Sequence, residues 1–534
     1  MVAYRQVTFI LLLSAIGLQA QENRYIVHFK DKLNTPYSID EPEQFLSSKS
    51  LDRRDKQQIP VLQEDLPVNP SYISGVKNSG AKTFFSSRWL NCLLIEADPA
   101  ILPAIQSLPY VSKTELVAPG KKLTGGRIRK WKSKNGSPDA AATVQQLQLI
   151  GLDEMQLEGF RGENLTIAVF DSGFPGVNFT SPFQPLFLEN RLKFTYNFVA
   201  NTSNVYQYDD HGTEVFSVMA ADTPEFTGGA YKANFILFIT EDVTSEYRIE
   251  EFNWLFAAEK ADSAGVDIIN ASVGYNLFDD SSMNYTSSSL DGKTAIVTQA
   301  ATKAISKGMV VLCSAGNEGS NSWKFVTPPA DASGILAVGS VTEQEARSNF
   351  SSIGPSADGR IKPDVMALGS GTAVVKSNGS IGSNSGTSFA SPLVASLAAG
   401  VWQAFPFLSA VEIYESIVKS ADQYNTPDTQ KGYGLPHFRA VKNYIESGVI
   451  NEEITIHPNP LAGDSIAVTL KNPKGDSLSI IVYDLQGKII TESTHSITWE
   501  NNPLYYNLSG LGPGMYFIKA ISGSSSKIFR IVKL

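Results

Sequence analysis

An alternation of strand-like and helix-like segments between residues 143 and 445 is the feature that most constrains how this chain folds. Five segments are almost continuously apolar and rich in Ile, Val and Leu, as strands buried on both faces are: 165–173, 234–240, 266–274, 309–317 and 334–341. Between them, segments 247–265 and 293–308 have helical patterns that end on glycine. The alternation predicts an α/β domain with a doubly wound parallel sheet, covered by helices on both faces.

Residues just after these strands are the candidates for function, because sites in such sheets gather at the carboxyl ends of the strands. The first apolar strand runs directly into Asp171, which is followed by Ser172 and Gly173. An Asp just before a glycine is also ordinary turn chemistry. Asp171 alone therefore supports either a turn or a site.

His211 is the candidate base among the 5 histidines of the chain. It stands in Asp210-His211-Gly212-Thr213, where it precedes a glycine and opens an apparent helix. A lone His is more often structural than catalytic. The other histidines do not lie at a comparable strand-to-helix junction: His28, His437, His457 and His495.

Ser388 stands within the sequence SGTSFASP, residues 385–392, before a run of small residues. Glycine allows close backbone approach at a turn, and we expect Ser388 at the start of a buried helix whose N-terminus stabilises negative charge. The alternative is that a serine here only caps the helix.

Asp171, His211 and Ser388 together match the needs of nucleophilic catalysis, in which a base takes the serine proton and a carboxylate orients the base. Their order along the chain is that of subtilisin. With the motifs FDSG, DHGT and SGTSFASP, residues 143–445 resemble the subtilisin-like serine proteases, the subtilases of peptidase family S8. The resemblance implies an Asp-His-Ser triad on a subtilisin-like fold.

Asn317 begins the sequence Asn317-Glu318-Gly319, which matches the oxyanion-hole motif of that family. The resemblance implies that the Asn317 amide and the Ser388 N–H stabilise the oxyanion; the alternative is an ordinary Asn-containing loop. It also implies substrate-binding residues that flank the P1 side chain and bond to the substrate backbone as an added strand: Ser272, Val273, Gly274, Ser314, Ala315 and Gly316. Glu318 is similar to the residue that lines the far end of that pocket.

Glu214 departs from the family pattern, in which a second His commonly follows as HGTH. The triad does not require that His, so we expect changed packing or charge near the site without loss of activity.

The 2 cysteines exclude a disulfide framework. Cys313 is interpreted as a small buried hydrophobe, and no bridge to Cys92 is expected.

Composition limits the other possibilities. With 534 residues, 42% of them hydrophobic, the chain can form several cores, about three domains at roughly 150 residues each. The net charge of -9 has the wrong sign for binding nucleic acid or an anionic membrane surface. We therefore expect no nucleic-acid partner.

Residues 1–20 predict a signal peptide, with Arg5, an apolar run over 9–18 and Ala20 before the cleavage point. The alternative is a membrane anchor, but the run is shorter than the ~20 apolar residues of a span.

Residues 21–118 predict a small α+β unit: strand 24–31, then strand 91–97, helix 98–108 and strand 110–117. This unit resembles the inhibitor-type propeptide of subtilisins, which implies a zymogen whose own propeptide is a folding template and inhibitor.

Residues 119–142 predict an exposed linker, rich in basic residues and without an acid until Asp139. Such a run is either simply solvated or a place for cleavage, and no particular bond is indicated.

Residues 446–534 predict an all-β sandwich of short strands separated by Gly, Pro and Asn turns. Segments 457–460, 482–490, 508–520 and 527–534 resemble the type A sorting domain of the type IX secretion system of Bacteroidetes. The resemblance implies export through the periplasm and outer membrane by the secretion machinery. The rival interpretation is a carbohydrate-binding or adhesive β-sandwich.

The functional hypothesis is a secreted serine endopeptidase that hydrolyses peptide bonds of proteins through an acyl-enzyme on Ser388. The alternative is a non-catalytic cell-surface binding protein on the same fold. We expect a monomer with no required cofactor and no metal in the site. Many relatives bind structural calcium, but no motif here allows such a site to be assigned.

Overall fold

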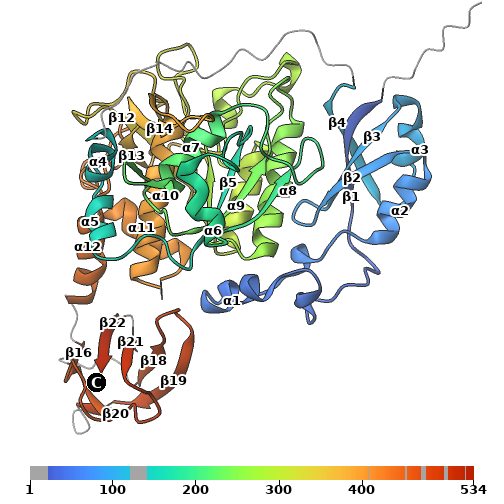
Figure 1. The fold of residues 1–534 in the computed structure, drawn as a ribbon. Coiled ribbons are helices and arrows are strands. Elements are labelled where there is room, and N and C mark those ends of the chain that lie inside the picture. Colours follow the sequence, from blue (N-terminus) through green and yellow to red (C-terminus); the bar gives the residue numbers. More distant parts are fainter. Residues whose placement is uncertain are drawn as a thin grey trace, which may run out of the picture.

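The computed structural model of the chain describes residues 22–120, 141–406, 408–450, 454–470, 477–497, 503–523 and 525–534. The predicted signal peptide and all but the ends of the predicted linker lie outside the described residues. In Figure 1 an N-terminal domain, in blue, lies beside a large central domain, and a C-terminal β-domain, in red, lies below it.

The N-terminal domain is the predicted α+β unit, a four-stranded antiparallel sheet in the order β2-β3-β1-β4. Its strands are β1 (Asn23–Phe29), β2 (Lys82–Ser87), β3 (Cys92–Ala97) and β4 (Val111–Ala118). Its helices are α1 (Ser48–Lys56), α2 (Pro70–Asn78) and α3 (Leu102–Gln106). The predicted helix 98–108 is a 3-10 turn over Pro99–Ile101 followed by α3.

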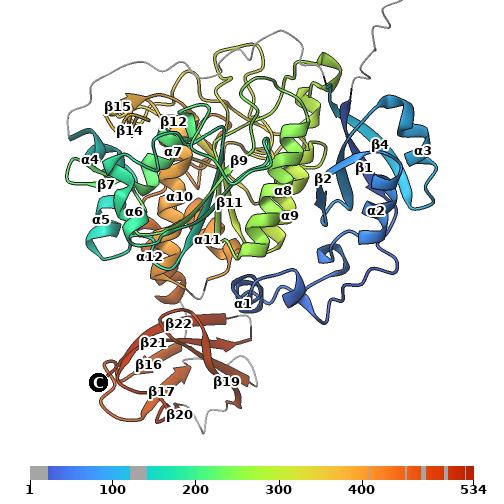
Figure 2. The same ribbon diagram turned by 45° about the vertical axis from the view of Figure 1, so that its right-hand side comes forward.

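Helix α1 was not predicted, and it lies away from the N-terminal sheet, beneath the central domain (Figures 1 and 2). It carries two buried arginines that both reach Asp262 of the central domain: Arg53 at 2.5 Å and Arg54 at 2.8 Å. Arg88, from the end of β2, bonds to the same carboxylate, and Arg54 also pairs with Asp65 at 3.1 Å. The N-terminal domain is thus joined to the central domain by buried charges as well as by its sheet.

The central domain contains the predicted parallel sheet, with seven strands in the order β13-β12-β11-β10-β5-β9-β6. Every neighbouring pair in it is parallel. The strands are β5 (Thr166–Asp171), β6 (Leu192–Asn197), β9 (Asn234–Ile239), β10 (Ile268–Ala271), β11 (Val310–Ser314), β12 (Leu336–Val341) and β13 (Val365–Leu368). Two small hairpins accompany them: β7 (Asp222–Thr223) with β8 (Phe226–Thr227), and β14 (Thr372–Val375) with β15 (Ile381–Asn384).

Helices cover both faces of the sheet, as predicted for this class of fold. They are α4 (Ala141–Gln148), α5 (Leu152–Leu157), α6 (Gln184–Leu188), α7 (His211–Ala220), α8 (Ile249–Ala264), α9 (Ile296–Ser306), α10 (Thr387–Ala404), α11 (Ala410–Lys419) and α12 (Phe438–Ile450). Figure 2 shows α8 and α9 between the sheet and the N-terminal domain. Helix α8 ends, as its sequence predicts, on Gly265, whose φ of 77° is left-handed.

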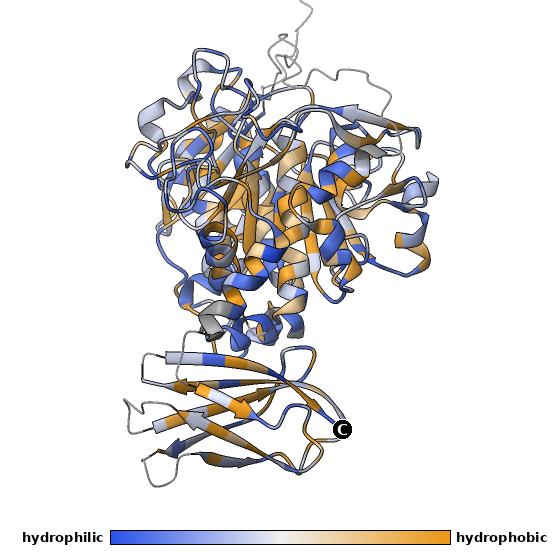
Figure 3. Cartoon of the chain, turned by 90° about the vertical axis from the view of Figure 1, so that its left-hand side faces the viewer, coloured by the Kyte–Doolittle hydropathy of each residue, from blue (hydrophilic) through white to orange (hydrophobic). Residues whose placement is uncertain are grey.

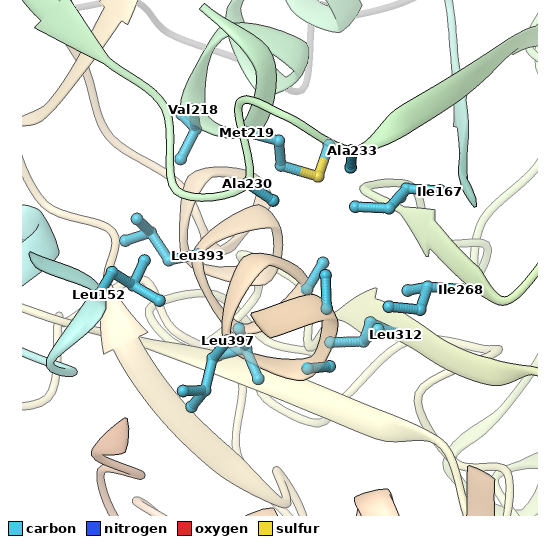
Figure 4. Packing of buried hydrophobic residues seen from close by; sticks show 14 of the residues in the cluster. Leu152, Ile167, Val218, Met219, Ala230, Ala233, Ile268, Leu312, Leu393 and Leu397 are labelled. Carbon is cyan, nitrogen blue, oxygen red and sulfur yellow. The ribbon is translucent and has the colours of Figure 1, made fainter. Parts of the chain in front are cut away.

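The opposite face is covered by α10, which is buried along most of its length. Figure 4 shows this packing: Ile268 and Leu312, from β10 and β11, lie on one side of the helix, and Leu152 of α5 lies on the other. Helix α10 therefore runs through the middle of a continuous apolar cluster.

The C-terminal domain is the predicted β-sandwich of two antiparallel sheets. One contains β16 (Ile454–His457), β17 (Ser465–Leu470) and β20 (Leu504–Asn507); the other contains β18 (Ser477–Tyr483), β19 (Ile489–Ser496), β21 (Gly514–Ser522) and β22 (Ser525–Lys533). Figure 3 shows apolar and polar residues mixed along these strands, and the apolar ones form a separate core between the sheets. Of the helices in the described ranges, none combines the length and the apolar content that a membrane span needs.

Candidate active site

Asp171 is the last residue of β5 and is completely buried at the carboxyl end of the central sheet. Its Oδ1 atom accepts a hydrogen bond from His211 Nδ1 at 2.8 Å and another from the Ser172 N–H at 2.7 Å. A carboxylate can only accept, so Nδ1 of His211 carries a proton. The contact thus holds the ring in the tautomer that leaves Nε2 able to take a proton.

His211 is the first residue of α7, which begins directly against Asp171. The close approach depends on Gly212, where a Cβ atom would lie 2.3 Å from the carbonyl oxygen of Gly173. Burial lowers the pKa of His211, but the Asp171 carboxylate first, and Glu214 and Asp209 after it, outweigh that effect. The net result is a pKa raised above the ordinary value, as stabilisation of the imidazolium requires.

Ser388 lies in the first turn of α10 and is buried. Its neighbour Phe389 places its ring 5.8 Å from the His211 ring, so the start of α10 lies beside the base. Ser388 Oγ makes a long contact of 3.4 Å with the carbonyl oxygen of Ser272. The structure therefore brings Asp171 and His211 into contact and places the turn that carries Ser388 beside them.

Pro392 frees a backbone carbonyl group near the start of α10 to bond outside the helix. A proline has no N–H, so the carbonyl group of Ser388, four residues earlier, lacks its normal partner within the helix. Ser272 Oγ donates to that carbonyl instead, at 2.9 Å. This bond ties the nucleophile's backbone to the segment after β10, and the N–H of Gly386 is held by the Gly369 carbonyl at 2.7 Å.

Asn317 follows β11 and faces the same helix start. Its side-chain oxygen accepts from the N–H of Thr387 at 2.9 Å and from the Thr387 hydroxyl at 3.0 Å. Because the side-chain oxygen of Asn317 accepts these two bonds, its NH₂ group is directed away from Thr387, where it can act as a donor. The predicted pairing of the Asn317 amide with the Ser388 N–H is consistent with this orientation.

A pocket of about 230 Å³ opens beside Asn317. Its lining includes five of the residues that the sequence predicts for the site: Gly274, Ser314, Gly316, Asn317 and Glu318. Of the other predicted substrate-binding residues, Val273 and Ala315 are buried in an apolar cluster, and Ser272 bonds to the Ser388 carbonyl group. Glu318 accepts a hydrogen bond from the side-chain amide of Asn321 at the rim.

Thr327 and Asn321 also line this pocket and were not predicted. Thr327 is 3% exposed, and its hydroxyl oxygen has no hydrogen-bond partner among the described residues. A Cβ atom at Gly274 would lie 2.2 Å from that oxygen, and one at Gly316 would lie 2.9 Å from it. The hydroxyl of Thr327 thus fills the space between the two glycine-containing walls of the pocket.

Within the described ranges, no group of three or more His, Cys, Asp or Glu side chains is arranged to hold a metal ion. Cys92 and Cys313 are both free and buried, as predicted for Cys313, and burial raises the pKa of each thiol well above its ordinary value. Neither thiol is suited to act as a nucleophile.

Comparison with family models finds a match to each part of the chain. Residues 162–434, just over half of the chain, match the model described as "Subtilase family". Residues 24–135 match "Peptidase S8 propeptide domain, Bacteroidota", and residues 455–534 match "Secretion system C-terminal sorting domain". The three resemblances drawn from the motifs are thereby confirmed.

Individual relatives cover the same region. Subtilisin DY from Bacillus licheniformis is 28% identical over 52% of this chain and 90% of its own length. Subtilisin NAT from Bacillus subtilis subsp. natto is 30% identical over 49% of this chain, which spans only 62% of that protein. The crystal structure of MycP1 from Mycobacterium smegmatis, 20% identical, aligns over 59% of this chain and 88% of its own with a TM-score of 0.45.

Proposed function

The chain belongs to the subtilase family of serine endopeptidases, and we propose that it hydrolyses peptide bonds of proteins through an acyl-enzyme on Ser388. The observation that carries the proposal is the contact of Asp171 with His211 at 2.8 Å beside the start of α10. The sorting domain indicates export to the cell surface or the medium.

The first half of the proposed reaction forms the acyl-enzyme. His211 Nε2 takes the proton of Ser388 Oγ while that oxygen bonds to the substrate carbonyl carbon. The carbonyl oxygen becomes negative and is stabilised by the Asn317 NH₂ and the Ser388 N–H, at the positive end of α10. His211 then gives its proton to the leaving amine as the peptide C–N bond breaks.

The second half releases the product. A water molecule gives its proton to His211 and bonds to the acyl carbon, and the Ser388 ester bond breaks as His211 returns the proton to Oγ. Asp171 stays ionised throughout and stabilises the imidazolium that forms in each half. The segments at 272–274 and 314–316 bind the substrate backbone as an added strand, with its P1 side chain in the pocket beside Thr327.

The flanking domains fit a zymogen. We infer that the N-terminal domain inhibits the enzyme before its removal, since the matched family of propeptides belongs to the same peptidase family. The alternative is a binding protein that has kept the fold without turnover. The arrangement of Asp171, His211, Asn317 and Ser388 favours the enzyme, because a binding function needs neither the tautomer control nor the oriented amide.

Labelling of the exported protein with a fluorophosphonate tests the proposal. We expect one adduct on Ser388 that is absent from S388A and slowed at least ~100-fold in H211A. S396A is the matched control, because Ser396 is a buried serine of the same helix whose hydroxyl only bonds to the Pro392 carbonyl. Absence of a Ser388-dependent adduct would overturn the enzyme hypothesis in favour of the binding protein.

A further inference from the structure

Glu214 is a buried carboxylate near the base that the mechanism above does not use. It lies on α7, three residues after His211, and is 3% exposed. Both of its carboxylate oxygens are bonded to side chains of the protein itself. Its position is the one where the family pattern commonly has a second His, so its role has to follow from its own contacts.

Two side chains hold the carboxylate, and both come from the β14–β15 hairpin. Lys376 Nζ lies 2.5 Å from Oε1, and Asn384 Nδ2 donates to Oε2 at 2.7 Å. Lys376 can reach inward because Gly382 on the opposite strand has no side chain, and a Cβ atom there would lie 2.9 Å from Lys376 Cε. The hairpin is thus shaped to bring one cation and one amide to Glu214.

The same hairpin leads directly to the nucleophile. Asn384 is its last residue, and its side-chain oxygen accepts from the N–H of Ser385 at 2.8 Å. Ser385 Oγ in turn accepts from the Gly371 N–H at 2.9 Å, and Ser388 follows three residues later. A continuous path of hydrogen bonds therefore joins Glu214, on the helix of the base, to the loop that ends at Ser388.

Several charged groups face His211 from the elements packed around it. Asp171 comes from β5, Glu214 from α7 itself, and Asp209 from the loop before α7, where it accepts the His211 N–H at 3.0 Å. Lys376, from the hairpin, contacts Glu214. Lys376 offsets the negative charge of Glu214. Removing Glu214 therefore disfavours the His211 imidazolium, whereas removing Lys376 favours it.

We propose that Glu214 is a positioning residue, whose carboxylate ties the helix of His211 to the hairpin that delivers Ser388 and whose charge at the base is balanced by Lys376. This inference rests on the proposed role of His211 as the base. It assigns a joint function to three residues outside the triad: Glu214, Lys376 and Asn384.

The test is the pH dependence of the second-order rate constant for fluorophosphonate labelling, whose acidic limb reports the protonation of His211 in the free enzyme. In E214Q, loss of a negative charge disfavours the imidazolium, so the midpoint should fall by on the order of 0.5 pH unit. In K376M, Glu214 loses its counter-charge, so the midpoint should rise by about the same amount. K376R keeps the charge and should behave as the parent.

A second measurement does not depend on activity. In an S388A background, the imidazole of His211 can be titrated by NMR, since the chain has only 5 histidines. The E214Q and K376M changes should shift this titration in opposite directions. E158Q removes a similar charge from the exposed Glu158–Lys442 pair and should shift nothing.

The outcomes separate the inference from the proposed function. A parent protein without any Ser388 adduct would refute the proposed function. A labelled parent whose E214Q and K376M variants titrate like it, or shift in the same direction, would overturn the inference alone. Opposite shifts with rescue by K376R would establish it, because a merely structural role for Glu214 predicts slower labelling without paired shifts.

Discussion

The N-terminal and C-terminal domains both lie against the central domain, but they are attached to it in different ways. The N-terminal domain shares an apolar cluster with it, to which Ile26, Trp89 and Val117 contribute. Its three arginines surround Asp262, which is completely buried, and Glu259 accepts hydrogen bonds from the backbone N–H groups of Arg88 and Trp89. The N-terminal domain thus supplies the counter-charges and hydrogen-bond donors for these two carboxylates of the central domain.

The C-terminal domain has a core of its own and touches the rest through its surface. In the turn between β18 and β19, the carbonyl oxygen of Gln486 accepts a hydrogen bond of 2.7 Å from Lys56, in an exposed position. From this difference we infer that the propeptide and the central domain unfold as one cooperative unit, whereas the sorting domain is a separate module. Three predictions follow from this contrast, each made in S388A protein so that the chain stays intact.

The largest effect is expected from D262N. Loss of this charge leaves the guanidinium groups of Arg53, Arg54 and Arg88 without their shared partner in a buried place. Breaking a buried ion pair on one side costs about 3 to 5 kcal/mol of stability. Denaturant unfolding of the full chain, followed by tryptophan fluorescence, should show this loss in the transition of the central domain.

E415Q is the control for D262N, since the exposed pair between Glu415 and Lys419 contributes less than about 0.5 kcal/mol. An unfolding free energy of D262N within that margin of the parent would mean that the propeptide is held by its sheet alone. The two flanking domains would then differ in the area that they bury against the central domain and not in buried ion pairs.

A smaller effect is expected from E251Q, on the helix α8 that the propeptide covers. Burial raises the pKa of Glu251 to about 7, although the Val297 N–H and the Tyr285 hydroxyl donate to it. Between its ordinary pKa of 4.5 and about 7, the unfolded state releases a proton that the folded state keeps. Stability is therefore lost as the pH rises through this window, by at most about 3 kcal/mol.

The variant lacks this titrating group, so it should not lose stability in this window. From pH 5 to pH 8, the unfolding free energy of E251Q should therefore increase relative to that of the parent. E158Q, at the surface, should show no such trend. A difference that is equal at both pH values would show that Glu251 ionises in the folded protein as easily as in the unfolded one.

Most of the fold could be predicted because buried parallel strands have a continuous apolar pattern. Strands β5, β9, β10, β11 and β12 lie where that pattern is. The edge strand β6 was missed because it is only partly buried and alternates with polar residues. Helix α1 was missed because its arginines look like a solvated face, and only the partner Asp262, 208 residues away from Arg54, makes them buried.

The candidate site could be located but not completed from the sequence. Asp171, His211 and Ser388 stand at strand ends and helix starts, where local sequence marks them. Thr327 and Lys376 do not stand in a recognisable motif of this kind. They reach the site only because the chain turns after β11 and β14. Pro392 is the signal that could have been used, since it implies a free carbonyl at Ser388 and hence a partner such as Ser272.

The smallest effect on stability is expected from deletion of residues 451–534. Because the C-terminal domain has a separate core, the unfolding free energy of the remaining protein should change by less than about 1 kcal/mol. Export should nevertheless fail, with the truncated protein retained in the periplasm, as immunoblots of cell fractions and medium would show. A truncated protein that is exported normally would mean that the domain is a binding module, and a strongly destabilised one would mean that it belongs to the same cooperative unit as the propeptide.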